Sequence, residues 1–209
     1  GFFARLFGKA KPLAKIVQQY ELVRNQIDDI SNALERHKTQ LLTDIASLDT
    51  VDITAMTGSQ MSSLTTAQVN ALTAGQLTAM GSTQIAGLTG TQLAAMDSGI
   101  NDFGTAQFAA MSASQVGSLT SAQITGLEAA DWAALGSAQI GSVGTAAMAA
   151  LGSDELRALS TLQVQGLTAA QIRAIGTADF SAFETEDLAA LRPAVLAALT
   201  TDMLAAVSG

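Results

Sequence analysis

The chain has 209 residues and a formal net charge of −8 at pH 7; 48% of the residues are hydrophobic but only 4% are aromatic. It contains no Cys, which excludes disulfides, thiolate metal sites and Cys nucleophiles. No run of about 18 apolar residues occurs, so no transmembrane helix is predicted. The chain begins without Met, which indicates a fragment or a processed chain.

The charge divides the chain into two predicted domains. Residues 1–47 carry seven basic and five acidic residues, a net charge of +2, whereas residues 48–209 carry three basic and thirteen acidic residues, a net charge of −10. An acidic surface repels phosphate backbones, so nucleic acid is not expected as a partner. We predict a basic lead plus one helix over 1–47 and a repeat domain over 48–209.

Residues 1–11 combine three Phe with basic side chains. Such a segment can make weak contact with an anionic membrane surface, and this is one expectation for it. The alternative is a short helix that packs on its neighbour.

A long amphipathic helix is predicted from Pro12 to Leu48. Its apolar residues recur in steps of mostly three and four, the spacing of a coiled coil. They are Leu13, Ile16, Val17, Tyr20, Val23, Ile27, Ile30, Leu34, Leu41, Ile45 and Leu48. A helix of this length, roughly 55 Å, buries its apolar face only against a partner. We therefore expect it to cap the repeat domain or to associate with another copy of the chain.

His37, the only histidine, lies where this apolar stripe would continue. It could act as a pH-sensitive or ligand-binding residue. Because no second ligand stands at metal-binding spacing, we interpret it as a solvated residue of the seam.

Residues 4–49 resemble the toxic-anion (tellurite) resistance TelA-like family. The resemblance covers the basic lead and three short phrases: Gln19-Tyr20; Gln26-Ile27-Asp28 with Ile30; and Leu41-Leu42, Asp44-Ile45 and Leu48-Asp49. It implies a helical, cytoplasmic protein with a role in anion or envelope-stress resistance. The chain departs from the family pattern after Asp49.

From Leu48 onward an eight-residue unit repeats, as in Leu64–Ala71, LTTAQVNA. A large apolar residue occupies the first position and a second one the sixth. Only one unit is shorter: Met96 to Phe103 spans seven residues, and we expect the array to bend there. Regularity over some 160 residues indicates a repeat array. The resemblance here is to Leu-Thr-Ala-Gln-rich octapeptide repeats of large bacterial surface and secreted proteins.

One short helix per unit fits this pattern best. A continuous helix would turn the apolar positions away from any fixed face, and the odd spacing does not suit a plain strand. The fold class is therefore predicted as all-α, a long N-terminal amphipathic helix followed by a solenoid of short helices. A β-solenoid is the alternative.

Each helix is expected to begin with a capping box between Thr or Ser and the Gln three residues later. The pairs are Thr65/Gln68, Thr73/Gln76, Thr89/Gln92, Ser112/Gln115, Thr120/Gln123 and Thr168/Gln171. Where Gly replaces the cap, we expect left-handed geometry at the end of the previous helix. The replacements are Gly81, Gly136, Gly152 and Gly176, and acids take the Gln position at Asp52, Asp131, Glu155, Asp179 and Asp187.

No catalytic, cofactor-binding or metal-binding residue is assigned, and no cofactor is expected, since none of the common catalytic motifs occurs. Glu184, Glu186 and Asp187 could chelate a cation, but we interpret them as a solvated helix start. Trp132 and the pairs Phe103/Phe108 and Phe180/Phe183 occupy core positions and are interpreted as core residues.

The function predicted is a non-enzymatic structural or scaffolding repeat protein linked to toxic-anion stress resistance. It is expected in the cytoplasm, with self-association through the N-terminal helix. The alternative is an extracellular spacer or stalk of an adhesin-type protein, secreted or at the cell surface.

Overall fold

The computed structural model describes residues 10–208, and they form two compact units that divide after residue 45. The described residues contain helices and no strand, which confirms the all-α prediction and does not support a β-solenoid. The expected membrane-surface contact of residues 1–11 involves side chains outside the described part of the chain.

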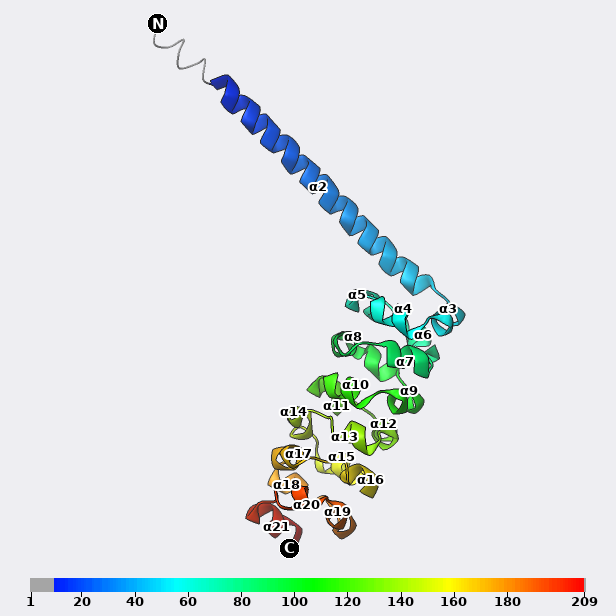
Figure 1. Cartoon of the computed structure of the whole chain (residues 1–209), viewed down its shortest axis with the longest axis vertical. Coiled ribbons are helices and arrows are strands. Elements are labelled where there is room, and N and C mark those ends of the chain that lie inside the picture. The colour runs from blue at the N-terminus through cyan, green and yellow to red at the C-terminus, as the bar shows by residue number, and fades with distance from the viewer. Residues whose placement is uncertain (1–9, 209) are drawn as a thin grey trace. The chain divides into compact units, whose positions relative to one another are not determined.

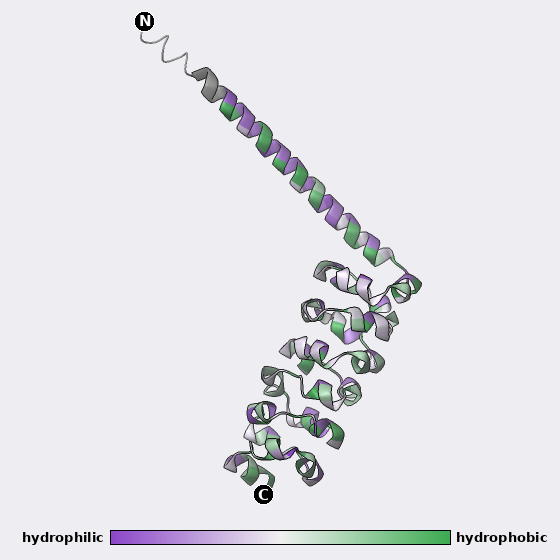
Figure 2. Cartoon of the chain, in the orientation of Figure 1, coloured by the Kyte–Doolittle hydropathy of each residue, from purple (hydrophilic) through white to green (hydrophobic). Residues whose placement is uncertain are grey.

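The first unit is built on the long helix α2, Ala10–Ser47, with 38 residues, of which the last two belong to the second unit. Pro12 lies in its first turn, where a missing backbone N–H breaks no hydrogen bond. Figure 2 shows apolar and polar residues interspersed along the coloured part of the helix, beyond its first turn. Between residues 10 and 208 no helix is both long enough and apolar enough to cross a membrane.

The second unit is an array of short helices, most with four to six residues (Figure 1). In chain order they are α3 Thr50–Ala55, α4 Gly58–Ser63, α5 Thr66–Asn70, α6 Ala74–Ala79, α7 Ser82–Gly87, α8 Gly90–Ala95, the 3₁₀ helix η1 Ser98–Asp102, α9 Thr105–Ala110, α10 Ala113–Ser118, α11 Ser121–Thr125, α12 Ala129–Ala134, α13 Ser137–Ile140, α14 Thr145–Met148, α15 Ser153–Arg157, α16 Thr161–Val164, α17 Ala169–Ala174, α18 Thr177–Phe180, α19 Thr185–Ala190, α20 Pro193–Leu196 and α21 Thr201–Ser208.

Nearly every short helix packs on the helix three units further along the chain. Thus α3 contacts α6, α4 contacts α7, α5 contacts α8, and the order continues to α18 and α21, with the weakest pairing between α12 and α15. Three octads, or 24 residues, therefore complete one coil of a solenoid. The 3₁₀ helix η1 keeps this order, because it contacts α6 and α11. Whether the array bends at the short unit stays a prediction.

The core of the array consists of the two large apolar residues of each unit, as the octad pattern predicts. The second apolar residue is fully buried in most units, for example Ile85, Leu93 and Ile124. The first closes each helix, as when the Leu88 N–H donates to the Ile85 carbonyl at 3.1 Å. Burying such side chains contributes about 1.5–3 kcal/mol each and holds together helices too short to be stable alone.

The last coil departs from the predicted core. Leu196 and Leu204 were expected in the core, but they are 41% and 50% exposed, and Val195 and Met203 are buried instead. In the octads that form α20 and α21, an apolar residue replaces the Gln. The buried position moves back by one residue, and no later coil within residues 10–208 covers the displaced leucines.

All six predicted capping boxes are present, including Thr65/Gln68 and Ser112/Gln115. The expectation of left-handed geometry at the capping glycines was wrong. Gly81 has φ −85°, and no described glycine has a positive φ. The preceding residue already ends its helix in an extended conformation, so no left-handed residue is needed to turn the chain.

At some positions Gly is required because the backbones of two helices approach each other closely. Gly58 in α4 and Gly87 in α7 face each other from adjacent coils. A Cβ on Gly87 would lie 2.5 Å from the Cα and carbonyl oxygen of Gly58. Contacts this short require the backbone to shift. By contrast, a Cβ on Gly75 in α6 would meet no atom within 4 Å.

We predict that Gly87→Ala destabilises the array by about 1–3 kcal/mol, because overpacking forces two helices apart. Gly75→Ala, the matched control, should stabilise it by about 0.5–1 kcal/mol through helix propensity. Chemical denaturation followed by circular dichroism measures both changes. Equal effects of the two substitutions would contradict the close approach of α4 and α7.

Candidate functional site

The fifth residue of the unit, usually Gln, makes the polar contacts between coils. Gln115 in α10 shows the arrangement: its Oε1 accepts from the backbone N–H of Ser112 at 2.8 Å, and Ser112 Oγ accepts from the Gln115 N–H at 3.2 Å. Its Nε2 donates to the carbonyls of Ile85 at 2.7 Å and Leu88 at 2.8 Å. One side chain thus caps its own helix and binds the end of a helix in the preceding coil.

We call this arrangement the glutamine latch. It recurs at nine buried positions, where Nε2 donates to a carbonyl 27–31 residues earlier: Gln76, Gln84, Gln92, Gln107, Gln115, Gln123, Gln139, Gln163 and Gln171. We call the bend between two successive helices a corner. Each latch joins the corner at which its own helix begins to the corner of the preceding coil on which it is stacked. The latches therefore set the register between successive coils.

Sequence reasoning found only the capping half of the latch. A capping box accepts either Glu or Gln at its last position, since only an oxygen acceptor is needed. The array uses Gln at most of these positions, and this preference was a signal that the amide nitrogen has a role. A buried amide with all its hydrogen bonds made is stabilising, whereas a buried unpaired one is costly.

We predict that Gln115→Glu destabilises the array by at least about 2 kcal/mol at neutral pH, because its carboxylate would face two carbonyl oxygens. Burial raises the pKa of such a carboxyl in the folded state, so the loss should shrink as pH falls through that value. Thermal melts between pH 4 and pH 8 measure the effect.

Gln60→Glu is the matched control. Gln60 is exposed, and its Oε1 accepts from the Thr57 N–H at 2.8 Å, a bond that a carboxylate keeps. Among residues 10–208, no hydrogen bond joins Gln60 to an earlier coil. A similar loss for both variants would refute the role of the amide nitrogen.

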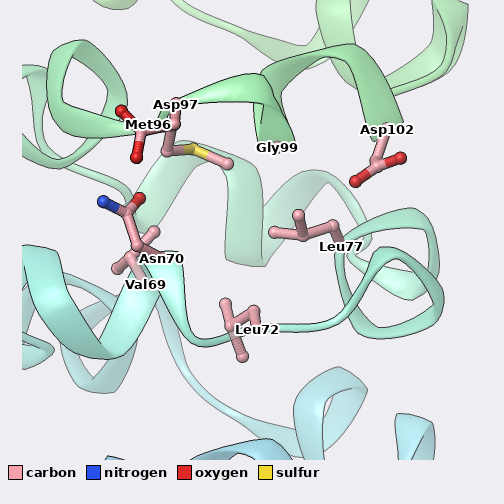
Figure 3. A pocket seen from close by; sticks show the side chains of 8 residues that line it. All are labelled: Val69, Asn70, Leu72, Leu77, Met96, Asp97, Gly99 and Asp102. Carbon is pink, nitrogen blue, oxygen red and sulfur yellow. The ribbon is translucent and has the colours of Figure 1, made fainter.

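The latch is interrupted at the short unit that contains η1. In the register of the repeat, its Gln would donate to the carbonyls of Val69 and Leu72, but Gly99 stands at that place. A cavity of about 240 Å³ lies there, and its lining includes Val69, Leu72, Asp97, Gly99 and Asp102 (Figure 3). This cavity, which we call the η1 cavity, was not predicted from the sequence.

A second interruption lies one coil further along. Asp131 in α12 occupies the latch position above the carbonyls of Ile100 and Phe103, and a carboxylate cannot donate to them. Burial raises the pKa of Asp131, and the nearby Glu128 carboxylate raises it further, while a hydrogen bond from the Glu128 backbone lowers it in part. Ionised Asp131 is therefore less stable in the folded chain than in the unfolded chain.

The raised pKa of Asp131 makes the stability of the array depend on pH. The folded state holds the Asp131 proton more tightly, so stability should fall as pH rises from the ordinary value of 3.8 through the raised value. We predict that Asp131→Gln stabilises the array at pH 7 by about 1 kcal/mol, by restoring the latch. The gain should decrease as pH falls through this range.

Glu128→Gln tests the cause. It removes the neighbouring charge and keeps Asp131, so the pH range should move toward the ordinary value. Thermal melts of the three proteins from pH 3 to pH 8 give the comparison. A difference between the original chain and Asp131→Gln that does not change with pH would contradict the assignment.

The residues singled out in the sequence are not brought together. His37 is exposed on α2, in the first unit. Glu184 and Glu186 are exposed, and Asp187 caps α19 by accepting from the Glu184 N–H at 3.3 Å. Within residues 10–208, no three His, Cys, Asp or Glu side chains lie close enough together to hold a metal ion.

The aromatic residues of the array lie in its core, as expected. Trp132 is 1% exposed. The rings of Phe103 and Phe108 are 6.1 Å apart edge-to-face, and those of Phe180 and Phe183 are 5.2 Å apart. Both pairs stabilise contacts inside the array and leave no aromatic face for a ligand to stack on.

Two protein families match parts of the chain. The profile of the Toxic anion resistance protein (TelA) family matches residues 1–60, and that of the ALTTAQ repeat matches residues 45–82, 124–161 and 148–183. The chain is a repeat protein. Both resemblances inferred from the sequence, to the TelA family and to the Leu-Thr-Ala-Gln-rich repeats, are confirmed. Comparison with curated proteins and with solved structures gives no match.

Proposed function

We propose that this chain is a non-enzymatic scaffold of the toxic-anion stress response, in which helix α2 gathers several copies and each copy presents its solenoid. The match of residues 1–60 to the TelA family supports the link to toxic anions. The exposed apolar seam of α2 supports the association. We further propose the cytoplasm as its compartment, and the likeness to that family supports this proposal.

The seam is the observation that carries this proposal. From Ile16 to Leu41 the steps alternate strictly between four and three residues, which gives heptad positions a and d. The a positions are Tyr20, Ile27, Leu34 and Leu41, and the d positions are Ile16, Val23, Ile30 and His37. The apolar members are 47–69% exposed, far more than the core residues of the array.

Further copies of the same helix fit this seam. The flanking e and g positions carry no acid, and a parallel arrangement sets Arg24 beside Gln19 and Lys38 beside Ala33 of the next copy, so like charges do not meet. Branched residues at d disfavour two-stranded coiled coils and favour three or four strands. We therefore expect a parallel trimer or tetramer.

We predict that Ile27→Asp converts this oligomer to a monomer, because the charge would be buried in the seam. Leu22→Asp is the matched control: Leu22 lies on the same helix, outside the seam, and is 58% exposed against 60% for Ile27. Light scattering after gel filtration gives the mass of each. A monomeric original chain, or equal dissociation by both changes, would refute the seam.

A single cysteine tests the orientation. The chain has none, so Ile16→Cys introduces one thiol near the start of the seam. In a parallel bundle the thiols of neighbouring copies lie together and form a disulfide under oxidation. An antiparallel bundle would separate them, and no crosslink would form.

The alternative is an extracellular spacer or stalk. The stacked coils of the array favour it, since a solenoid of this kind separates what is attached at its two ends. Cell fractionation distinguishes the two functions because the stalk requires export. Sensitivity to tellurite after deletion of the gene would support the scaffold.

A further inference from the structure

The η1 cavity lies where the repeat elsewhere places a donor. At eight latches, the Gln Nε2 donates to two backbone carbonyls of the preceding corner. These belong to the two large apolar residues that flank the corner or to their neighbours. Gln107, for example, donates to Leu77 at 2.6 Å and to Met80 at 3.1 Å. The equivalent acceptors at the η1 corner are Val69 and Leu72. Among the side chains that the structure describes, those of residues 15–97 and 99–207, none is hydrogen-bonded to either carbonyl, and both residues line the cavity.

The chain itself shows what else can bind such a corner. In α20, Val195 replaces the latch Gln, and Arg192 takes over its role from the capping position. The guanidinium Nη2 of Arg192 donates to the Leu167 carbonyl at 2.8 Å, which is the acceptor that a Gln at 195 would use. A guanidinium therefore satisfies one of the two acceptors of the glutamine amide, and it also donates to the Gly166 carbonyl at 3.5 Å. It does so from the capping position, outside the helix that would carry the Gln.

The electrostatic surroundings of the η1 cavity favour a positive group more than a neutral one. The carboxylates of Asp97 and Asp102 lie on either side of it, and no basic residue is in its lining (Figure 3). Asn70, also in the lining, already donates its amide to the Ala95 carbonyl at 2.8 Å. No described basic side chain in the lining balances these oxygens, and a donor from another molecule would do so.

The size of the η1 cavity and its access to solvent also suit a long, positively charged side chain. Its volume of about 240 Å³ is several times that of one water, about 30 Å³. Asn70, Asp97 and Asp102 are exposed, so the opening reaches solvent. Leu77 and Met96 supply an apolar wall for the carbon stem of a long side chain (Figure 3).

We propose that the η1 cavity binds the guanidinium of an arginine side chain from a partner protein. The planar fork of a guanidinium donates to the carbonyls of Val69 and Leu72 while its charge is balanced by Asp97 and Asp102. The bound arginine completes the latch that the short unit lacks. The partner would thereby join the array at its one short unit, independently of the seam on α2.

The test uses the full chain and the peptide acetyl-Gly-Arg-Gly-amide. Citrulline in place of Arg keeps the donors but removes the charge, and norleucine removes both. We expect measurable binding of the Arg peptide by calorimetry and at least tenfold weaker binding of the other two. Equal binding of the Arg and citrulline peptides would overturn the assignment to a guanidinium.

Methyl NMR locates the binding. The chain has seven methionines, and only Met96 lines the cavity, so its methyl signal should shift on titration while the other six stay in place. Shifts elsewhere, or none, would show that the η1 cavity holds only water or that the peptide binds the acidic surface without specificity.

Two variants complete the test. Gly99→Gln puts an amide where the repeat expects one, and it should abolish Arg binding while circular dichroism stays unchanged. Asp97→Asn with Asp102→Asn should weaken binding at least tenfold. Asp154→Asn, an exposed acid in α15, is the control and should leave the affinity unchanged. Unaltered affinity in the double variant would overturn the proposal, even if Gly99→Gln misfolds.

Discussion

The structure of the array depends on one constraint: helices too short to be stable alone must exchange hydrogen bonds with the coil before them. A helix of four to six residues leaves most of its terminal backbone groups unpaired. The glutamine latch binds both kinds of terminal group at once, the N–H groups at a helix start and the carbonyl groups at a helix end. In Gln115, the oxygen accepts from the start of one helix and the nitrogen donates to the end of another. Apolar burial supplies the cohesion, and the latch determines which coil positions face each other.

This constraint explains why the interruptions in the array are informative. Where the latch residue is missing or replaced, the backbone carbonyls of the preceding corner stay in place without the glutamine donor. Three of these interruptions differ in what stands at the corner. Arg192 replaces the Gln from a neighbouring position, Asp131 faces the carbonyls with a raised pKa, and the short unit leaves the η1 cavity. The candidate binding site is thus a consequence of the repeat.

The sequence predicted the parts of this fold that depend on local chemistry. The octad gave the short helices, their caps and the buried residues of most units, because capping boxes and apolar spacing act within eight residues. It did not predict three helices per coil, since the angle at each corner is set by packing between coils. The donor half of the latch, which spans 27–31 residues, and the η1 cavity were missed for the same reason. The shifted core of the last coil could not be foreseen either, because Val195 and Leu196 are equally apolar.

The latch has a consequence for how such arrays change in length. Each latch reaches back by one coil, and the nine latched corners use the same chemistry, so a duplicated or deleted octad among them would leave the other latches with equivalent partners. With three octads per coil, one octad more or less also rotates everything beyond it by about 120° around the solenoid axis. Gene duplications of a single unit would therefore re-aim distal surfaces without loss of stability, whereas duplications of 24 residues would extend the array and preserve its faces.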